Sequence, residues 1–178
     1  MTGATALPEF RFRSGEPKDT DALVSLINVA FIPEQIAIEG ERINAEKLQP
    51  FFAKGKFLML ENSDGVVGCV YAELRGEHRG YIGLLALRPE LQGRGLGRLL
   101  MNRCEEYLAD SGCDWADLRT ISARDDLVPM YKHLGYQETG VAEISVEIPL
   151  KTPCHFITMS KRLVRSESRS ESQSDAEM

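Results

Sequence analysis

One continuous segment carries the strongest structural signal in this chain, and it reads, from residue 81 to residue 98, Tyr81-Ile-Gly-Leu-Leu-Ala-Leu-Arg-Pro-Glu-Leu-Gln-Gly-Arg-Gly-Leu-Gly-Arg98. Residues 81–87 are apolar or glycine and too few for a helix, so they predict a buried strand. A short loop around Pro89 follows, and then glycines alternate with other residues up to Gly97. The segment therefore predicts a strand, a glycine-rich turn and a helix that begins near Leu96.

The glycine-rich turn predicts an anion-binding site. Glycines accept a positive φ and let a ligand approach the backbone without obstruction by a Cβ atom. The first amides of the following helix have no partner inside it and lie at the positive end of the helix dipole. Arg94 and Arg98 add positive charge beside them. A phosphate or pyrophosphate fits this pattern, and a tight loop without a ligand is the alternative.

Two common phosphate-binding motifs do not match this turn. A Walker-type loop requires Gly-Lys-Ser/Thr after its second glycine, which is absent here. A dinucleotide-binding fingerprint requires GxGxxG, and Arg98 stands where the third glycine belongs. That fingerprint also requires a ribose-binding acid after the next strand, but the chain continues there as Ser122-Ala123-Arg124. The expected phosphate site therefore belongs to another class of fold.

Hydrophobic periodicity predicts strands and helices on both sides of this segment. Asp64-Gly65 predicts a hairpin turn, Gly112 and Gly135 are placed to end helices, and Asp125 or Asp126 is placed to cap the last helix. The expected strands cover residues 10–13, 57–61, 66–74, 81–87, 115–122, 137–146 and 154–161. The expected helices cover residues 17–31, 42–53, 96–108 and 127–134.

Length and composition predict a single globular domain. The chain has 178 residues, of which 43% are apolar and 27% charged. We expect a loose leader over residues 1–9, one domain over 10–163 and a disordered tail over 164–178. The tail is rich in serine and charge, so it cannot bury enough apolar area to offset its ordering entropy. Signal-peptide and membrane-spanning patterns are absent, so the expected location is cytoplasmic.

The net charge of −6 limits the kinds of molecule that we expect this protein to bind. Nucleic-acid binders usually carry a basic surplus, so we expect neither nucleic acid nor a membrane as partner, while an acidic surface attracts cationic amines. The four cysteines and three histidines are scattered along the chain, which disfavours a metal site. Whether two chains pair as a homodimer is left open by the sequence.

The sequence resembles the GNAT superfamily of acyl-CoA N-acyltransferases. The pyrophosphate motif of that superfamily, Gln/Arg-x-x-Gly-x-Gly/Ala, is matched by residues 92–97. Its tyrosine followed by a Gly-aromatic pair is matched by Tyr131 and by Gly135-Tyr136. The likeness extends from Phe10 to Lys161. It implies an α+β, three-layer α/β fold whose mixed, mostly antiparallel sheet is flanked by helices and splayed between strands 81–87 and 115–122.

The resemblance also implies where the co-substrate acetyl-CoA binds. The pantetheine arm would lie in the splay and pair with the backbone of Leu85 and Leu87, and the amides of residues 93–98 would hold the pyrophosphate. Arg124 takes the place of an asparagine that contacts the cofactor in many relatives. The expected cofactor-binding residues are Leu85, Ala86, Leu87, Gln92, Gly93, Arg94, Gly95, Leu96, Gly97, Arg98 and Arg124.

The implied reaction is direct attack of an amine on the thioester, which needs a base, a donor to the carbonyl and an acid for the thiolate. Tyr131 is the predicted acid, because a phenol has a pKa close to that of a thiol. The backbone N–H of Leu85 is the predicted donor to the carbonyl. Residues 81–87 contain no carboxylate, so Glu73 on the neighbouring strand is the predicted base, with a water chain as the alternative. Glu34 is predicted to bind a cationic substrate.

The leading function is therefore acetyl transfer from acetyl-CoA to a primary amine on a small molecule or a peptide. The alternative is a non-catalytic acyl-CoA-binding sensor module of the same fold. Tyr131 favours the enzyme, whereas the missing carboxylate on residues 81–87 favours the sensor. Cys69 is disfavoured as a nucleophile, because no histidine with a fitting orienting group is apparent.

Overall fold

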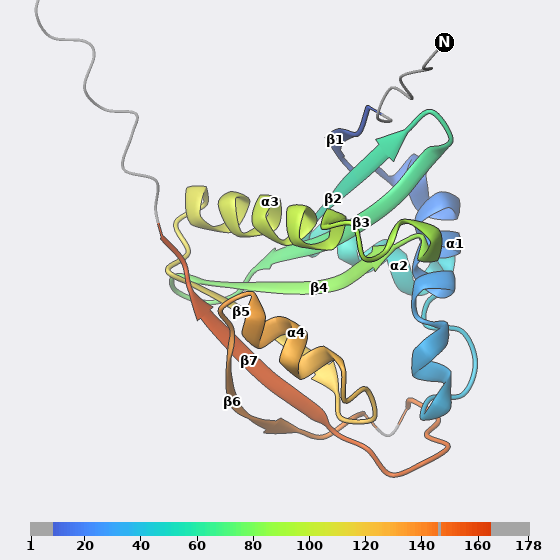
Figure 1. The fold of residues 1–178 in the computed structure, drawn as a ribbon, viewed down its shortest axis with the longest axis vertical. Helices are drawn as coiled ribbons and strands as arrows, with labels where there is room; N and C mark the ends of the chain where they lie inside the picture. Colours follow the sequence, from blue (N-terminus) through green and yellow to red (C-terminus); the bar gives the residue numbers. More distant parts are fainter. Residues whose placement is uncertain (1–8, 146, 165–178) are drawn as a thin grey trace, which may run out of the picture.

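The computed structural model describes residues 9–145 and 147–164. The predicted leader and the predicted disordered tail lie outside the described residues, except for residues 9 and 164. Figure 1 shows the order of elements. These are β1 (Arg11–Ser14), η1 (Pro17–Asp19), α1 (Thr20–Ala30), η2 (Ile32–Ile36), α2 (Ala45–Lys54), β2 (Gly55–Asn62), β3 (Gly65–Leu74), β4 (Arg79–Leu87), η3 (Pro89–Leu91), α3 (Leu96–Asp110), β5 (Trp115–Ile121), α4 (Leu127–His133), β6 (Gln137–Ala142) and β7 (Phe156–Arg162).

The strands of the described residues form one sheet in the order β1-β2-β3-β4-β5-β7-β6. Every neighbouring pair is antiparallel except β4 and β5, which run parallel. A short turn joins β2 to β3 at Asp64-Gly65, as the sequence predicts. The mixed, mostly antiparallel sheet with flanking helices confirms the predicted fold class.

The sheet opens between β4 and β5. These strands pair only through Arg79 with Trp115, Gly80 with Ala116, and Tyr81 with Asp117. Beyond these pairs β4 continues to Leu87 and β5 to Ile121, and the two strands diverge (Figure 1). The edge of residues 82–87 that faces β5 therefore has no strand partner within the described part of the chain. The predicted splay is confirmed.

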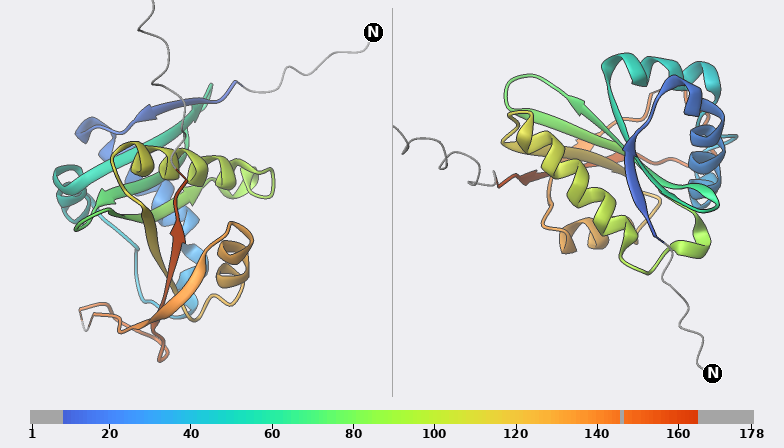
Figure 2. Two further views of the ribbon diagram at one scale, coloured as in Figure 1. Left: turned by 90° about the vertical axis from the view of Figure 1, so that its left-hand side faces the viewer. Right: turned by 90° about the horizontal axis from the view of Figure 1, so that it is seen from above.

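The helices lie on both faces of the sheet, with α1 and α2 on one side and α3 on the other (Figure 2). The apolar positions at helical spacing face the sheet: Leu23 and Ile27 of α1 are fully buried, as are Leu100 and Leu108 of α3. Residues of α4 pack into the same core as α3. None of the helices in the described ranges is long and apolar enough to cross a membrane.

The connection between β6 and β7 differs from the prediction. The sequence predicts a strand to residue 146, but β6 ends at Ala142. The chain leaves the sheet there because residues 149–151 pair with the segment that follows η2. The amide of Glu39 donates to the carbonyl of Pro149 over 2.9 Å, and the amide of Lys151 donates to that of Ala37 over 2.8 Å. The 3₁₀ helix η2 is another difference, because the sequence predicts no helix there.

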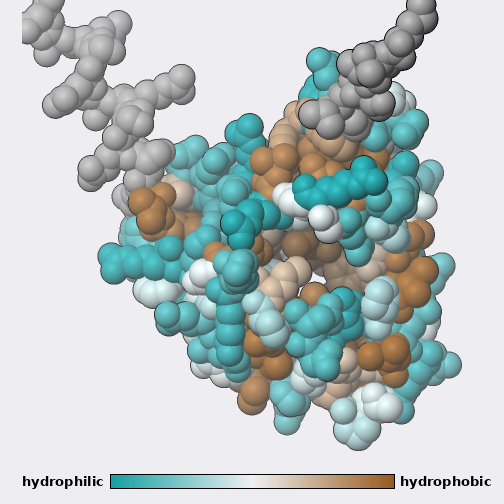
Figure 3. Space-filling model, in the orientation of Figure 1, coloured by the Kyte–Doolittle hydropathy of each residue, from teal (hydrophilic) through white to brown (hydrophobic). Residues whose placement is uncertain are grey.

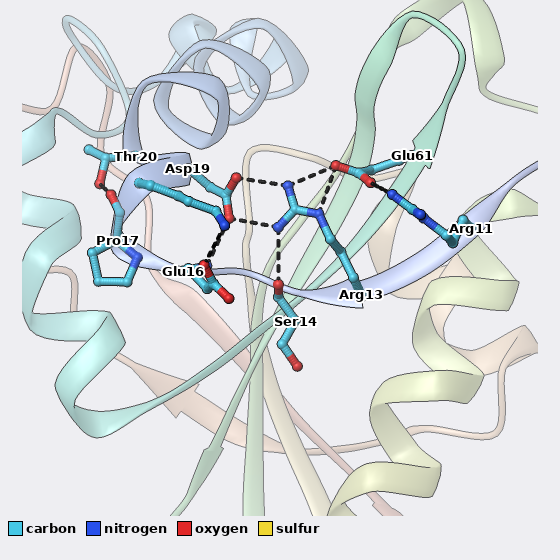
Figure 4. A network of polar contacts seen from close by, with 9 residues as sticks. Arg11, Arg13, Ser14, Glu16, Pro17, Asp19, Thr20 and Glu61 are labelled. Carbon is cyan, nitrogen blue, oxygen red and sulfur yellow. Dashed lines mark hydrogen bonds and ion pairs between the residues drawn. The ribbon is translucent and has the colours of Figure 1, made fainter.

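A partly buried ion-pair network fixes the N-terminal strand to the rest of the sheet (Figure 4). The guanidinium of Arg13 on β1 donates two hydrogen bonds to Asp19, at 2.7 and 2.8 Å, and one to Glu61 on β2, at 2.8 Å. Such two-pronged pairs are geometrically specific as well as strong. Arg13 lowers the pKa of Asp19 to about 2, so the carboxylate stays charged at neutral pH.

Candidate active site

A cavity of about 690 Å³ fills the splay of the sheet. Its walls come from β4 and β5, from the turn before α3, from α4 and from the segments 34–47 and 147–149. The space-filling view shows a depression near the centre of the molecule with apolar residues at its floor (Figure 3). A second cavity, of about 490 Å³, lies at α3 and α4 and shares Leu85, Gly97, Asp126 and Met130 with the first. The two cavities therefore adjoin at the mouth of the splay.

A β-bulge shapes the β4 wall of the cavity. The register between β3 and β4 shifts between Cys69 and Tyr71, and Leu84 has a φ of 48°, which is rare for a residue other than glycine. The thiol of Cys69 donates to the carbonyl of Leu84 over 3.6 Å and supports the bulge from the core. Bulges re-direct the backbone beside active sites. Here Leu85 follows the bulge and lines both cavities.

The glycine-rich turn has the geometry expected of an anion cradle. Gly93 and Gly95 have φ values of 75° and 82°, and a Cβ atom added at Gly93, Gly95 or Gly97 would meet no atom within 4 Å. The first backbone bond of α3 runs from the amide of Leu99 to the carbonyl of Gly95. The amides before it donate to no acceptor outside the helix in the described residues. The open backbone fits the pyrophosphate of acetyl-CoA.

The other predicted cofactor-binding residues divide into three groups. Leu87 and Gln92 line the main cavity, whereas Arg98 lines the second one. Ala86 and Leu96 are buried in the core, so only their backbone is suited to contact a ligand. Arg94 is exposed on the turn.

Tyr131 lies on α4 and lines the cavity across from Tyr81 of β4. Its ring packs edge-on against Tyr136, with ring centres 6.0 Å apart, and the Tyr136 hydroxyl donates to Glu105 over 2.8 Å. These contacts fix the direction of Tyr131. Burial raises the pKa of Tyr131 above its ordinary value, so the phenol keeps its proton at neutral pH. A protonated hydroxyl inside the splay is suited to donate a proton there.

Glu34 belongs to η2 and lines the main cavity. Only 13% of its side chain is exposed. Burial raises the pKa of the Glu34 carboxyl, while the charges of Arg42 and Arg124 act in the opposite direction. A partly buried carboxylate with a raised pKa is able to bind an ammonium group and to accept its proton.

Glu73 lies outside the residues that line the cavity. Its carboxylate accepts hydrogen bonds from Arg75 at 2.8 Å and from the Tyr71 hydroxyl at 2.9 Å. The bond with Arg75 lowers the pKa of Glu73, which makes it a weaker base. The structure therefore does not bring Glu73 together with Tyr131, and its role as the base stays a prediction.

Arg124 lines the cavity, but its guanidinium is paired with Asp126 through two hydrogen bonds of 2.7 Å. Asp126 therefore does not cap α4 with its side chain, which was one of the two expected caps. Asp125 is exposed in the same turn. The pair holds the loop between β5 and α4 beside Tyr131.

Sequence reasoning missed several residues that line the cavity, including Arg42, Arg119 and Thr120. Their positions carry no motif, because the loop before α2 and strand β5 are distant in sequence and meet only in the folded chain. Burial raises the pKa of the Cys69 thiol to about 12, so it is not a thiolate at neutral pH. Within the described ranges, no group of three or more potential metal-binding side chains of His, Cys, Asp or Glu occurs.

Comparison with known proteins agrees with this geometry. Residues 22–136 match the model of the acetyltransferase (GNAT) family. Among solved structures, the chain is similar to Ard1 from Thermoplasma volcanium, with 15% identity, a TM-score of 0.73 and coverage of 87% of this chain and 98% of that one. It is also similar to the ribosomal-protein-S18-alanine N-acetyltransferase from Escherichia coli, with 16% identity, a TM-score of 0.68 and coverage of 87% and 94%.

An N-acetyltransferase from Staphylococcus aureus Mu50 has the same fold, with 11% identity, a TM-score of 0.71 and coverage of 88% and 99%. Identities this low establish the fold alone, whereas the family match spans more than half of the chain. The fold and family together imply acetyl-CoA as the co-substrate. The chain belongs to the GNAT family of acetyltransferases and is an acyltransferase enzyme.

Proposed function

We propose that this protein transfers an acetyl group from acetyl-CoA to a primary amine by direct attack on the thioester. The observation that carries the proposal is the continuity of one cavity from the glycine cradle, past Tyr131, to Glu34. A cofactor held at the cradle would extend its arm along the unpaired edge of β4. An amine that enters beside Glu34 would then meet the thioester in the splay.

The chain's own groups have defined tasks in this reaction. Glu34 binds the ammonium group and takes one proton from it, and its raised pKa suits this step. The amide of Leu85, just after the bulge, donates to the thioester oxygen as negative charge develops there. As the tetrahedral adduct collapses, the nitrogen loses its second proton to solvent, while Tyr131 gives its proton to the departing thiolate and is reprotonated from solvent. One N–C bond forms, one C–S bond breaks, and the products are an acetamide and free CoA.

Thiol release tests the proposal. The purified chain is incubated with acetyl-CoA and single amines, including lysine, spermidine, isoamylamine and a short peptide with a free N-terminus. Thiol formation that depends on the amine, together with an acetylated product in mass spectrometry, would support the proposal. Tight binding of CoA in a calorimeter without acetylation of any amine would instead favour the sensor alternative.

A further inference from the structure

The acceptor end of the cavity contains charges of both signs. It is bounded by η2, by the loop that leads to α2, by β5 and by the β6–β7 connection. A site for a simple amine needs only an anion, yet cationic side chains gather here as well. Its charged lining residues are Glu34, Glu39, Glu41, Arg42, Lys47, Arg119, Arg124, Asp126 and Glu147.

Arg42 is distinguished by an unmet hydrogen bond. Its Nε atom is buried and has no hydrogen-bond partner in the described structure. The nearest carboxylate, that of Glu34, lies 3.8 Å away, which is too far for a hydrogen bond. The guanidinium lies over the ring of Phe31, 5.3 Å from the ring centre, and this contact supports it at the cavity wall. The side chain as a whole is 33% exposed and lines the cavity, so a ligand oxygen that pairs with the guanidinium would recover the free energy that the unpaired Nε costs.

The other arginines at this end are less available. Arg124 is held by Asp126 through two hydrogen bonds. Arg119 lies over the ring of Phe156 at 4.3 Å, on the wall formed by β5 and β7. Among the arginines of this cavity, an anionic group would therefore bind first at Arg42, next to Glu34. An arginine fork matches a carboxylate in shape and charge.

The boundaries of this compartment favour a small molecule. The segments at residues 37–39 and 149–151 are joined by two main-chain hydrogen bonds, and a side-chain bond from Lys151 Nζ to the carbonyl of Gln35, 3.0 Å long, adds to them. Ile38 and Ile148 line the cavity beside this junction. Paired backbone thus borders this part of the cavity, and Ile38 and Ile148 provide apolar surface there.

We propose that the acceptor is a small amino acid-like molecule, whose carboxylate binds Arg42 while its amine lies beside Glu34. This inference rests on the proposed acetyl transfer and names its substrate class. The two groups of an α-amino acid are borne by one carbon, which suits a cation and an anion 3.8 Å apart. The apolar side chains of Ile38 and Ile148 favour an aliphatic side chain on the acceptor.

The test compares acceptors that differ only at the carboxylate: leucine, leucinamide and isoamylamine, each with acetyl-CoA. The expected result is a kcat/KM for leucine at least tenfold above that for the other two. In Arg42→Gln this preference should shrink toward one, mainly through a higher KM for leucine. In Arg103→Gln, a control on the exposed face of α3, the preference should persist.

A second measurement does not depend on turnover. Binding of leucine and of 4-methylpentanoate, which has no amine, is measured by calorimetry with the CoA-bound chain. Binding of both to the wild type, weakened at least tenfold in Arg42→Gln, would support the inference even without acetylation. Equal turnover of leucine and isoamylamine would overturn the inference but leave the proposed acetyl transfer standing. Faster turnover of the short peptide than of leucine would have the same two consequences. Absence of leucine binding would overturn it as well.

Discussion

The side-chain amide of Gln92 donates a hydrogen bond to the backbone carbonyl of Leu87, 3.2 Å away. This bond joins the first residue of the glycine-rich motif to the end of β4. The side chain therefore sets the position of the turn relative to the strand along which the cofactor arm would extend. Gln92 belongs to the predicted cofactor-binding motif, but in this structure its side chain binds the protein's own backbone and so stabilises the turn.

Replacing Gln92 by leucine removes that bond and should weaken CoA binding about fivefold, because one neutral hydrogen bond contributes about 1 kcal/mol. The dissociation constant of CoA is measured by calorimetry. Gln49→Leu is the matched control, since Gln49 donates a hydrogen bond to Thr20 on an exposed surface. Unchanged CoA affinity in Gln92→Leu would show that the turn keeps its position without this bond.

Gly97 provides a prediction in which stability and binding change in opposite directions. It lies in the first turn of α3, where alanine favours the helix by up to about 1 kcal/mol over glycine. Its added methyl would point into open space at the cradle. Gly97→Ala should therefore raise the melting temperature and lower the affinity for CoA several-fold. Asn102→Ala, on the exposed side of the same helix, should raise stability and leave binding unchanged.

Tyr131→Phe should lower kcat by about ten- to a hundredfold with little change in the KM for acetyl-CoA, since general acid catalysis contributes about 10²–10⁴-fold and water replaces part of it. The ring contact with Tyr136 does not require the hydroxyl, so the fold should be retained. Steady-state thiol release measures both constants. Tyr107→Phe on α3 serves as the control, and equal kcat values in the two variants would remove Tyr131 from the mechanism.

Asp19→Asn should lower the free energy of unfolding at pH 7 by about 2 kcal/mol, because Arg13 depresses the pKa of Asp19 from 3.8 to about 2. The folded state holds the charged carboxylate more strongly than the unfolded state does. This contribution is therefore complete above about pH 5 and is lost as the pH falls from 4 toward 2.

Urea unfolding at several pH values measures this effect. The difference between the wild type and Asp19→Asn should be largest at pH 7 and should shrink toward pH 2. Asp21→Asn, an exposed neighbour on α1, should change stability far less at either pH. A difference between wild type and Asp19→Asn that is constant from pH 7 to pH 2 would contradict the role of the Arg13–Asp19 pair.

Glu34 and Glu73 are the two candidates for the general base, and substitution of each by glutamine distinguishes them. Glu73→Gln should leave kcat within about twofold of the wild type, because Glu73 is bound by Arg75 and Tyr71 and does not line the cavity. Glu34→Gln should lower kcat/KM by more than tenfold near neutral pH, as expected for loss of a general base. The pH profile of kcat/KM is the readout. The reverse order of effects would favour Glu73 over Glu34 as the base.

Local patterns in the sequence were enough for the main elements and for the cradle. The alternation of glycines before Leu96 identified the turn, and the apolar spacing in α1 and α3 identified their buried faces. These features depend on residues that are close in sequence, so their physical causes can be read from the chain directly. The family motif extended the prediction to the splay and to Tyr131.

The acceptor end was determined only by the tertiary structure. Nothing in the sequence near Leu84 signals a bulge with positive φ, which depends on the pairing of β3 with β4. Likewise, the segment between Glu34 and Arg42 is paired with residues 149–151, so its position depends on the β6–β7 connection. Contacts between segments more than 100 residues apart depend on the whole fold. The sequence by itself therefore predicted a phosphate site before α3, whereas the folded chain decided which charged side chains line the cavity beside Glu34 and Arg42.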